Sequence, residues 1–152
     1  RRFDRWIPIP DDEPVRHVSR MFVAAAHLRV PFFSIVLRKG YGLGAMAMAA
    51  GGFHAPEFTV AWPSGEFGAM GLEGAVRLGF RKELEAVPEG PARDARFEQL
   101  VAQQYGNGQA VRMAETLEID AVIDPAHTRR WLVQGLASAQ SRDQVRLMID
   151  TW

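Results

Sequence analysis

The sequence of 152 residues contains no cysteine and has no net charge, because 18 basic residues balance 18 acidic ones. Without cysteine there can be no disulfide and no thiolate zinc site, which fits a reducing compartment. Without net charge there is no field to attract nucleic acid or an anionic membrane surface. We therefore expect no nucleic-acid partner and no membrane partner.

Long apolar runs are also missing. No run approaches the roughly 18–20 residues that cross a bilayer, and residues 1–6 lack the apolar stretch of a signal peptide. The four histidines are scattered rather than spaced as ligands, so we expect no metal site. The 47% hydrophobic content is enough for a packed core in a chain of this length. These features together predict a cytoplasmic protein.

Helix-like and strand-like segments alternate along the chain. Residues 1–13 are expected to be irregular and residues 14–152 to form one domain. Apolar residues at helical spacing predict helices over 14–29, 42–50, 72–86, 93–105, 109–116, 126–139 and 142–151. Apolar, β-prone runs predict strands over 32–37, 58–62 and 121–124. Such alternation is typical of an α/β domain with parallel strand pairing.

A glycine-rich turn joins the first predicted strand to the next helix, with Gly40, Gly42 and Gly44 at alternate positions. Glycine lets the backbone come close to a ligand, and the N–H groups that begin a helix favour negative charge. Such a turn can stabilise an oxyanion without a catalytic side chain. Close packing of a helix on a strand explains the same spacing equally well. The dinucleotide-binding fingerprint fits badly, because no acidic residue ends a second strand about 20 residues further on.

Several short motifs occur in an order that resembles the carboxyltransferase β subunits of biotin-dependent acyl-CoA carboxylases, such as the propionyl-CoA and acetyl-CoA enzymes. The motifs are Val15-Arg16-His17, Val30-Pro31-Phe32, Leu37-Arg38-Lys39-Gly40-Tyr41-Gly42, Ala61-Trp62-Pro63, residues 68–76, Ile123-Asp124-Pro125 and Thr128-Arg129-Arg130. The resemblance implies a crotonase-like ββα spiral of the ClpP/crotonase superfamily. It also implies that the chain corresponds to the C-terminal one of the family's two such domains.

The resemblance further implies a function. In that family the N-terminal domain holds most of the acyl-CoA site, and the C-terminal domain receives carboxybiotin from a carrier protein. Matched position by position, the backbone N–H groups of Leu43 and Gly44, just after Gly42, would hold the ureido oxygen of biotin. The expected partners are an acyl-CoA-binding carboxyltransferase domain or subunit, a biotin carrier with its biotin carboxylase subunit, and further copies of this chain.

Three side chains near the turn are candidate substrate contacts. Met46 falls where many members carry a residue that tunes acyl-chain length, although ordinary core packing explains a methionine equally well. Lys39, with Arg38, would approach a carboxylate or the CoA phosphates, or else lie in solvent at a strand end. Tyr41 is expected to pack over the turn and border the substrate.

Two glutamates flank the second glycine-rich stretch, residues 65–74. Glu66 and Glu73 would serve capping, a dimer contact or acid–base chemistry, and Glu73 lies in the first turn of a predicted helix, where the helix dipole favours it.

Two other functions remain open. The family's acyl-CoA domain has no counterpart in this sequence, which would suit a non-catalytic truncated homologue that keeps only the fold and an assembly surface. A stand-alone crotonase-like acyl-CoA enzyme would need an acid or base beside the turn, and none is evident. The last predicted helix carries an apolar stripe that would bury against the core or another chain: Val145, Met148, Ile149 and Trp152.

Overall fold

The computed structural model describes residues 14–139. The elements in chain order are α1 (Pro14–Ala26), β1 (Phe33–Val36), β2 (Lys39–Tyr41), α2 (Gly42–Met48), β3 (Phe58–Ala61), β4 (Glu66–Gly68), α3 (Leu72–Gly79), α4 (Arg81–Glu85), α5 (Pro91–Asn107), α6 (Ala110–Glu115), β5 (Ala121–Val122), the 3-10 helix η1 (Pro125–His127) and α7 (Thr128–Ser138). The expected irregular segment 1–13 and the predicted helix 142–151 lie outside the described residues.

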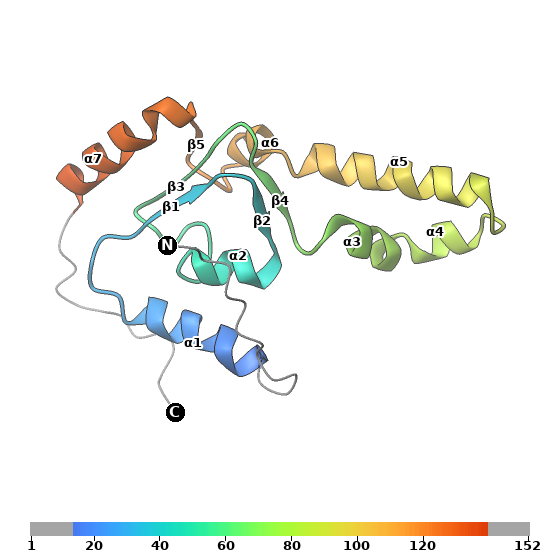
Figure 1. Ribbon diagram of the computed structural model, residues 1–152, viewed down its shortest axis with the longest axis horizontal. Coiled ribbons are helices and arrows are strands. Elements are labelled where there is room, and N and C mark those ends of the chain that lie inside the picture. The colour runs from blue at the N-terminus through green and yellow to red at the C-terminus, as the bar shows by residue number, and fades with distance from the viewer. Residues whose placement is uncertain (1–13, 140–152) are drawn as a thin grey trace, which may run out of the picture.

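The strands form two small parallel sheets. The first has the order β1-β3-β5, and the second pairs β2 with β4. In Figure 1, α1 and α2 lie on one side of these strands, and α6 and α7 lie on the other. The three strands predicted from the sequence therefore form one parallel sheet, as expected for alternating strands and helices.

The core lies where the two sheets meet α6. It contains the buried residues Ala61, Phe67, Ala110 and Ile119, with Val36, Phe53, Met113, Ala114 and Val122 packed against it. Phe53 and Phe67 meet edge to face at 5.3 Å between ring centroids, an arrangement that aromatic pairs prefer. A second aromatic group joins Phe33 on β1, Phe58 on β3 and Trp131 on α7.

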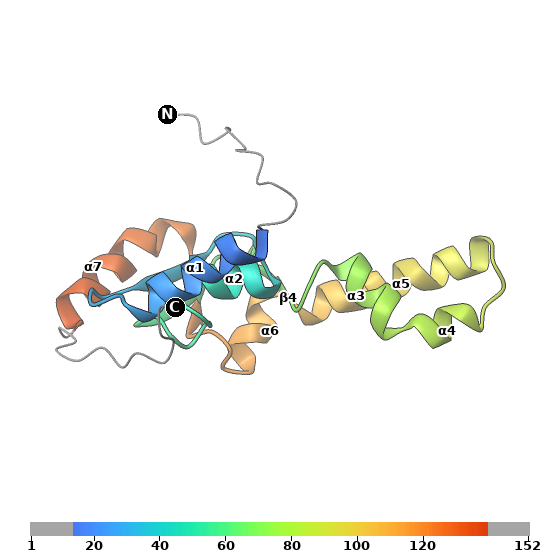
Figure 2. The same cartoon turned by 90° about the horizontal axis from the view of Figure 1, so that it is seen from below.

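The helices α3, α4 and α5 form an arm that extends away from the sheets (Figures 1 and 2). Val76 of α3 and Leu100 of α5 are almost completely buried between its two limbs. The Arg77 guanidinium lies 4.7 Å from the Phe97 ring centroid, and Arg96 pairs with Glu83 across the limbs. The arm therefore has a small apolar core of its own. Its root, where α3 begins and α5 ends, joins the arm to the sheets.

The observed element bounds differ from the predicted ones in two respects. The strands β2 and β4 were not predicted, because each has three residues, one of them glycine, which is too short for an alternating pattern. The predicted helix 72–86 is interrupted at Phe80, whose ψ of 21° ends α3 and begins α4. Within residues 14–139, no helix is both long and apolar enough to cross a membrane.

Candidate functional site

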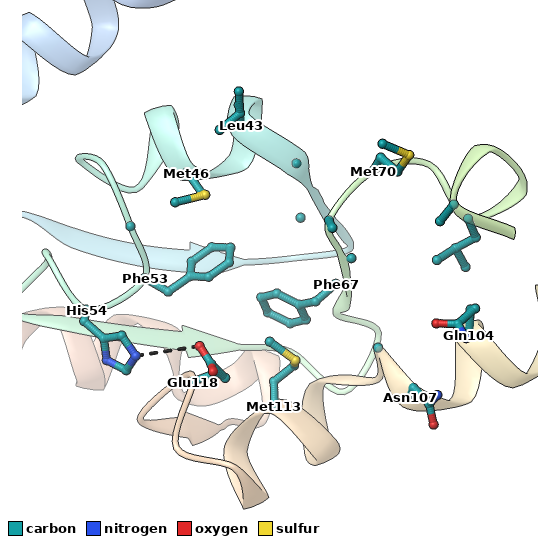
Figure 3. A pocket seen from close by; sticks show the side chains of 18 residues that line it. Leu43, Met46, Phe53, His54, Phe67, Met70, Gln104, Asn107, Met113 and Glu118 are labelled. Carbon is teal, nitrogen blue, oxygen red and sulfur yellow. Dashed lines mark ion pairs between the residues drawn. The ribbon is translucent and has the colours of Figure 1, made fainter. Parts of the chain in front are cut away.

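A cavity of about 720 Å³ lies between the glycine turn, β4 and the root of the arm. Its walls come from four places: the turn between β2 and α2, residues 52–54, the segment from β4 to the start of α3, and the end of α5 with α6 and Glu118. A volume of this size is typical of a small-molecule site. Figure 3 shows Phe53 and Phe67 in the middle of the cavity, with Leu43 and Met46 on one side and Met113 on the other.

The lining is mostly apolar and adaptable. Met46, Met70 and Met113 lie around the two phenylalanines, and Phe67 is almost completely buried. Methionine side chains fit irregular apolar ligands because their thioether chains bend easily. The cavity can therefore take an uncharged, largely apolar group.

The glycine turn supplies backbone donors at one wall. Gly42 has a φ of +62°, and a Cβ there would come within 3.0 Å of the Ala69 carbonyl oxygen, so the turn depends on glycine at this position. The chain then enters α2 with Tyr41 as its N-terminal cap, and no side chain caps it. The N–H groups of Leu43 and Gly44 meet no hydrogen-bond acceptor in the described part of the chain.

The predicted site residues fall into two groups. Gly42, Leu43 and Met46 line the cavity, and Met46 is directed toward Phe53 while the Leu43 side chain is directed away (Figure 3). Lys39, Tyr41 and Gly44 do not line it. Lys39 is exposed on β2, and Gly44 has open space around the position of its missing Cβ.

Tyr41 makes a contact that the sequence did not predict. Its hydroxyl donates to Glu66 Oε2 at 2.9 Å, while Tyr105 donates to Oε1 at 3.2 Å and Arg38 Nε lies 3.6 Å from Oε1. Burial and the bond to Glu66 raise the pKa of Tyr41 to about 12, so it remains a phenol at neutral pH. The hydroxyl of Tyr41 lowers the pKa of Glu66 in turn. Glu66 is therefore a buried carboxylate with two phenol donors and one cation, and it caps no helix.

Sequence reasoning missed the far end of the cavity. His54 Nε2 lies 3.7 Å from Glu118 Oε2, and this exposed pair borders the cavity beside Met113 (Figure 3). Gln104 and Asn107 border it from the end of α5. The sequence Gly106-Asn107-Gly108 signals the end of a helix, but only the tertiary structure brings it to the turn.

Metal-ligating side chains do not gather here. Across residues 14–139, no three histidine, aspartate or glutamate side chains come together in an arrangement that would hold a metal ion. Glu73, the second glutamate that flanks the glycine-rich stretch 65–74, lies exposed in the first turn of α3. The cavity therefore offers backbone hydrogen bonding and an apolar wall at the turn, with the polar side chains of His54, Glu118, Gln104 and Asn107 at its other end.

Comparison with known proteins defines the class to which this fold and cavity belong. A family model described as the carboxyl transferase domain matches residues 11–148. The chain therefore belongs to the carboxyl transferase domain family.

Three similar proteins illustrate this family. The methylmalonyl-CoA carboxyltransferase 12S subunit of Propionibacterium freudenreichii subsp. shermanii is 36% identical over 132 residues, which are 87% of this chain and 25% of that subunit. A crystal structure of transcarboxylase 12S is 31% identical, with a TM-score of 0.74, over 88% of this chain and 26% of the other. A single-chain, multi-domain long-chain acyl-CoA carboxylase is 55% identical, with a TM-score of 0.67, over 79% of this chain and 12% of the other.

Two conclusions follow from these similarities. The predicted fold class is confirmed, since the solved relatives are crotonase-like carboxyltransferase domains and the chain has the same mixed architecture with parallel sheets. The chain spans about a quarter of the length of the curated relatives that it matches. It therefore corresponds to only part of the length of these carboxyltransferases.

Proposed function

We propose that this chain forms the carboxybiotin-binding side of an acyl-CoA carboxyltransferase. A separate domain or subunit would supply the acyl-CoA site, and a biotin carrier with its biotin carboxylase would supply the carboxylated cofactor. Family membership supports the reaction class. The observation that carries the proposal is the uncapped turn at Leu43 beside an apolar cavity.

The residues present fit a biotin ring. The ureido carbonyl of biotin is an uncharged acceptor, and the N–H groups of Leu43 and Gly44 are donors without an acceptor in the described residues. The ring and its aliphatic arm are largely apolar, like the cavity wall formed by Met46, Phe53 and Phe67. Carboxybiotin, when bound, supplies the carboxyl group that is transferred.

The chain's own contribution is to stabilise charge and to orient. The N–H donors held at the turn by Gly42 would stabilise negative charge on the ureido oxygen of a bound carboxybiotin. One such donor is typically worth about 3–4 kcal/mol in a transition state. The apolar wall would exclude water from this oxygen and strengthen the hydrogen bonds.

The remaining candidate side chains take supporting positions in this proposal. Met46 would contact the apolar part of the acyl group, because it projects into the cavity. Lys39 is exposed on β2 and Tyr41 is turned toward Glu66, so they would reach only parts of the substrates outside the cavity. The similarity to a long-chain acyl-CoA carboxylase makes a long apolar acyl group a reasonable first substrate to test.

Reconstitution tests the proposal. The chain alone should show negligible carboxyl transfer, because the two reactants must be held in register, an advantage of about 7–11 kcal/mol in well-oriented systems. Adding the N-terminal domain of a related carboxyltransferase together with carboxybiotin should restore turnover.

Two variants at one position provide the matched control. Gly44→Pro removes one N–H donor, and proline is tolerated in the first turn of a helix. Gly44→Ala keeps the donor, and its Cβ meets no atom within 4 Å. We expect the proline variant to lose turnover and the alanine variant to keep it. Equal turnover in the two variants would show that this turn is not the oxyanion site. Full activity of the isolated chain would contradict the proposal that a separate domain or subunit supplies the acyl-CoA site.

A further inference from the structure

A buried carboxylate lies behind the cavity and has no part in the function proposed above. Glu66 begins β4 and is 8% exposed. One of its oxygens accepts from Tyr41 and the other accepts from Tyr105. Arg38 balances the charge from the exposed side. Every contact of this carboxylate is thus directed at another element rather than into the cavity.

The two phenol partners belong to different walls of the cavity. Tyr41 stands between Gly40 and Gly42, which line the turn wall, and Tyr105 directly follows Gln104 on the α5 wall. Glu66 itself directly precedes Phe67 and Gly68 of the β4 wall. One carboxylate therefore links three of the four walls from behind.

Backbone contacts leave this link little freedom. A Cβ on Gly68 would lie 3.1 Å from the Tyr41 ring, so the ring packs directly on the β4 backbone. The Phe67 N–H donates to the Gly108 carbonyl at 2.7 Å, and a Cβ on Gly108 would lie 2.0 Å from the Phe67 carbonyl oxygen. To these backbone contacts the Glu66 side chain adds one bond to the turn, through Tyr41, and one bond to the arm, through Tyr105.

We propose that Glu66 is a positioning residue that joins the turn, β4 and α5 walls of the cavity and couples the helical arm to the glycine turn. It touches no ligand. Its effect on ligand affinity rests on the proposed function, whereas its effect on wall geometry does not. Movement of α5 at Tyr105 would reach the turn at Tyr41 through the two oxygens of one carboxylate.

Glycine amide resonances report each wall separately. Gly42 marks the turn and Gly108 marks the end of α5, and both line the cavity. In a ¹⁵N-labelled chain, Tyr105→Phe should shift the Gly42 resonance as well as that of Gly108, and Tyr41→Phe should shift Gly108 as well as Gly42, because both phenols bond to the same carboxylate. Shifts confined to the wall of the substituted tyrosine would contradict the coupling. Glu66→Leu should shift both, because it removes both bonds at once.

A conservative variant separates positioning from folding. Glu66→Gln keeps the size of the side chain and one carbonyl acceptor, so it should restore part of the wild-type pattern that Glu66→Leu loses. Glu98→Gln is the matched control, since Glu98 is an exposed carboxylate on α5, and it should shift neither resonance. If Glu66→Leu does not fold, the two tyrosine variants and Glu66→Gln still decide the matter.

Biotin is the probe for affinity. Its dissociation constant should rise about tenfold in Glu66→Leu and less in Glu66→Gln, the range expected for lost hydrogen bonds, and should not change in Glu98→Gln. A Glu66→Leu variant with wild-type Gly42 and Gly108 resonances would overturn the proposal. Absence of biotin binding by the wild-type chain would count against the proposed function, while the resonance pattern would still decide the role of Glu66.

Discussion

Glycine is needed at position 108 because there is no room for a side chain, not because of its backbone angles. Its φ of −90° suits any residue, yet a Cβ would lie 2.0 Å from the Phe67 carbonyl oxygen. Because the Phe67 N–H also donates to the Gly108 carbonyl, the two backbones cannot separate without losing that bond. The end of α5 and β4 can therefore lie this close only because residue 108 has no side chain.

Gly108→Ala should destabilise the fold by about 2–3 kcal/mol, the range of a substitution that forces backbones apart. Gly106→Ala is the matched control two residues earlier, where nothing lies within 4 Å of the missing Cβ. It should stabilise the helix by about 0.4–1 kcal/mol. Urea unfolding followed by circular dichroism measures both. Equal stability of the two variants would contradict the close approach.

The pair of Tyr41 and Glu66 should make stability depend on pH at both extremes. The pKa of Tyr41 is raised from about 10 to about 12 in the folded chain, so its contribution is complete below pH 10 and is lost as the pH rises toward 12. The pKa of Glu66 is lowered, so its contribution is present above the ordinary carboxyl pKa and is lost as the pH falls through the folded value.

Unfolding free energies measured by urea titration at pH 9 to 11.5 test the predicted loss of stability at alkaline pH. The wild type should lose stability more steeply than Tyr41→Phe, which has no phenol to ionise. Tyr105→Phe is the control, and it should follow the wild type because Tyr41 keeps its bond to Glu66. Parallel profiles for wild type and Tyr41→Phe would show that Tyr41 is not held as described.

At the scale of elements, the arm has an apolar core separate from that of the sheets. Leu100 is 1% exposed between its limbs, whereas Leu78 on α3 is 68% exposed. Leu100→Ala should cost about 2–5 kcal/mol, as buried leucine truncations do, and Leu78→Ala should cost little.

Native-state hydrogen exchange locates the effect of Leu100→Ala. Amides of α3 and α5 should exchange faster than in the wild type, while those of β3 should keep their protection, because the arm meets the sheets only at its root. Uniformly faster exchange through β3 would show that the arm and the sheets unfold as one unit.

The sequence was most informative for long elements and least informative for short ones. The strands from Phe33 and from Phe58 were predicted from apolar, β-prone runs, and α5 was predicted from apolar residues at helical spacing, among which Leu100 is buried. The strands β2 and β4 bury only Gly40, Glu66 and Phe67 completely, which leaves no alternating pattern to recognise. The glycine turn was found because glycine spacing is a local signal.

The cavity opposite the turn could not be predicted in the same way. His54 and Glu118 are 64 positions apart and meet only after β3, the arm and α6 are placed. Tyr105 ends the predicted helix 93–105, and nothing in the sequence indicates that it is 46% exposed and bonds to Glu66. Such contacts depend on tertiary packing, for which no spacing rule in the chain gives a signal.

At the scale of the whole molecule, the expected assembly rests on the family to which the chain belongs. Met48, Leu78 and Val133 are each more than half exposed, but single apolar side chains on three different helices are ordinary on a protein surface. A related 12S protein forms hexamers. We expect a homodimer or a larger assembly. Light scattering at micromolar concentration measures it, and a strict monomer would contradict this expectation.

The central claim is that the glycine turn receives the ureido group of biotin. Titration of the ¹⁵N-labelled chain with biotin tests this most directly, by following the amide resonances of Gly42, Leu43 and Gly44. We predict saturable shifts at these residues and at Phe67 across the cavity, with Gly44→Ala behaving as the wild type and Gly44→Pro binding at least about tenfold more weakly, as expected for the loss of a hydrogen bond. Shifts confined to other surfaces, or equal binding by Gly44→Pro, would contradict the account.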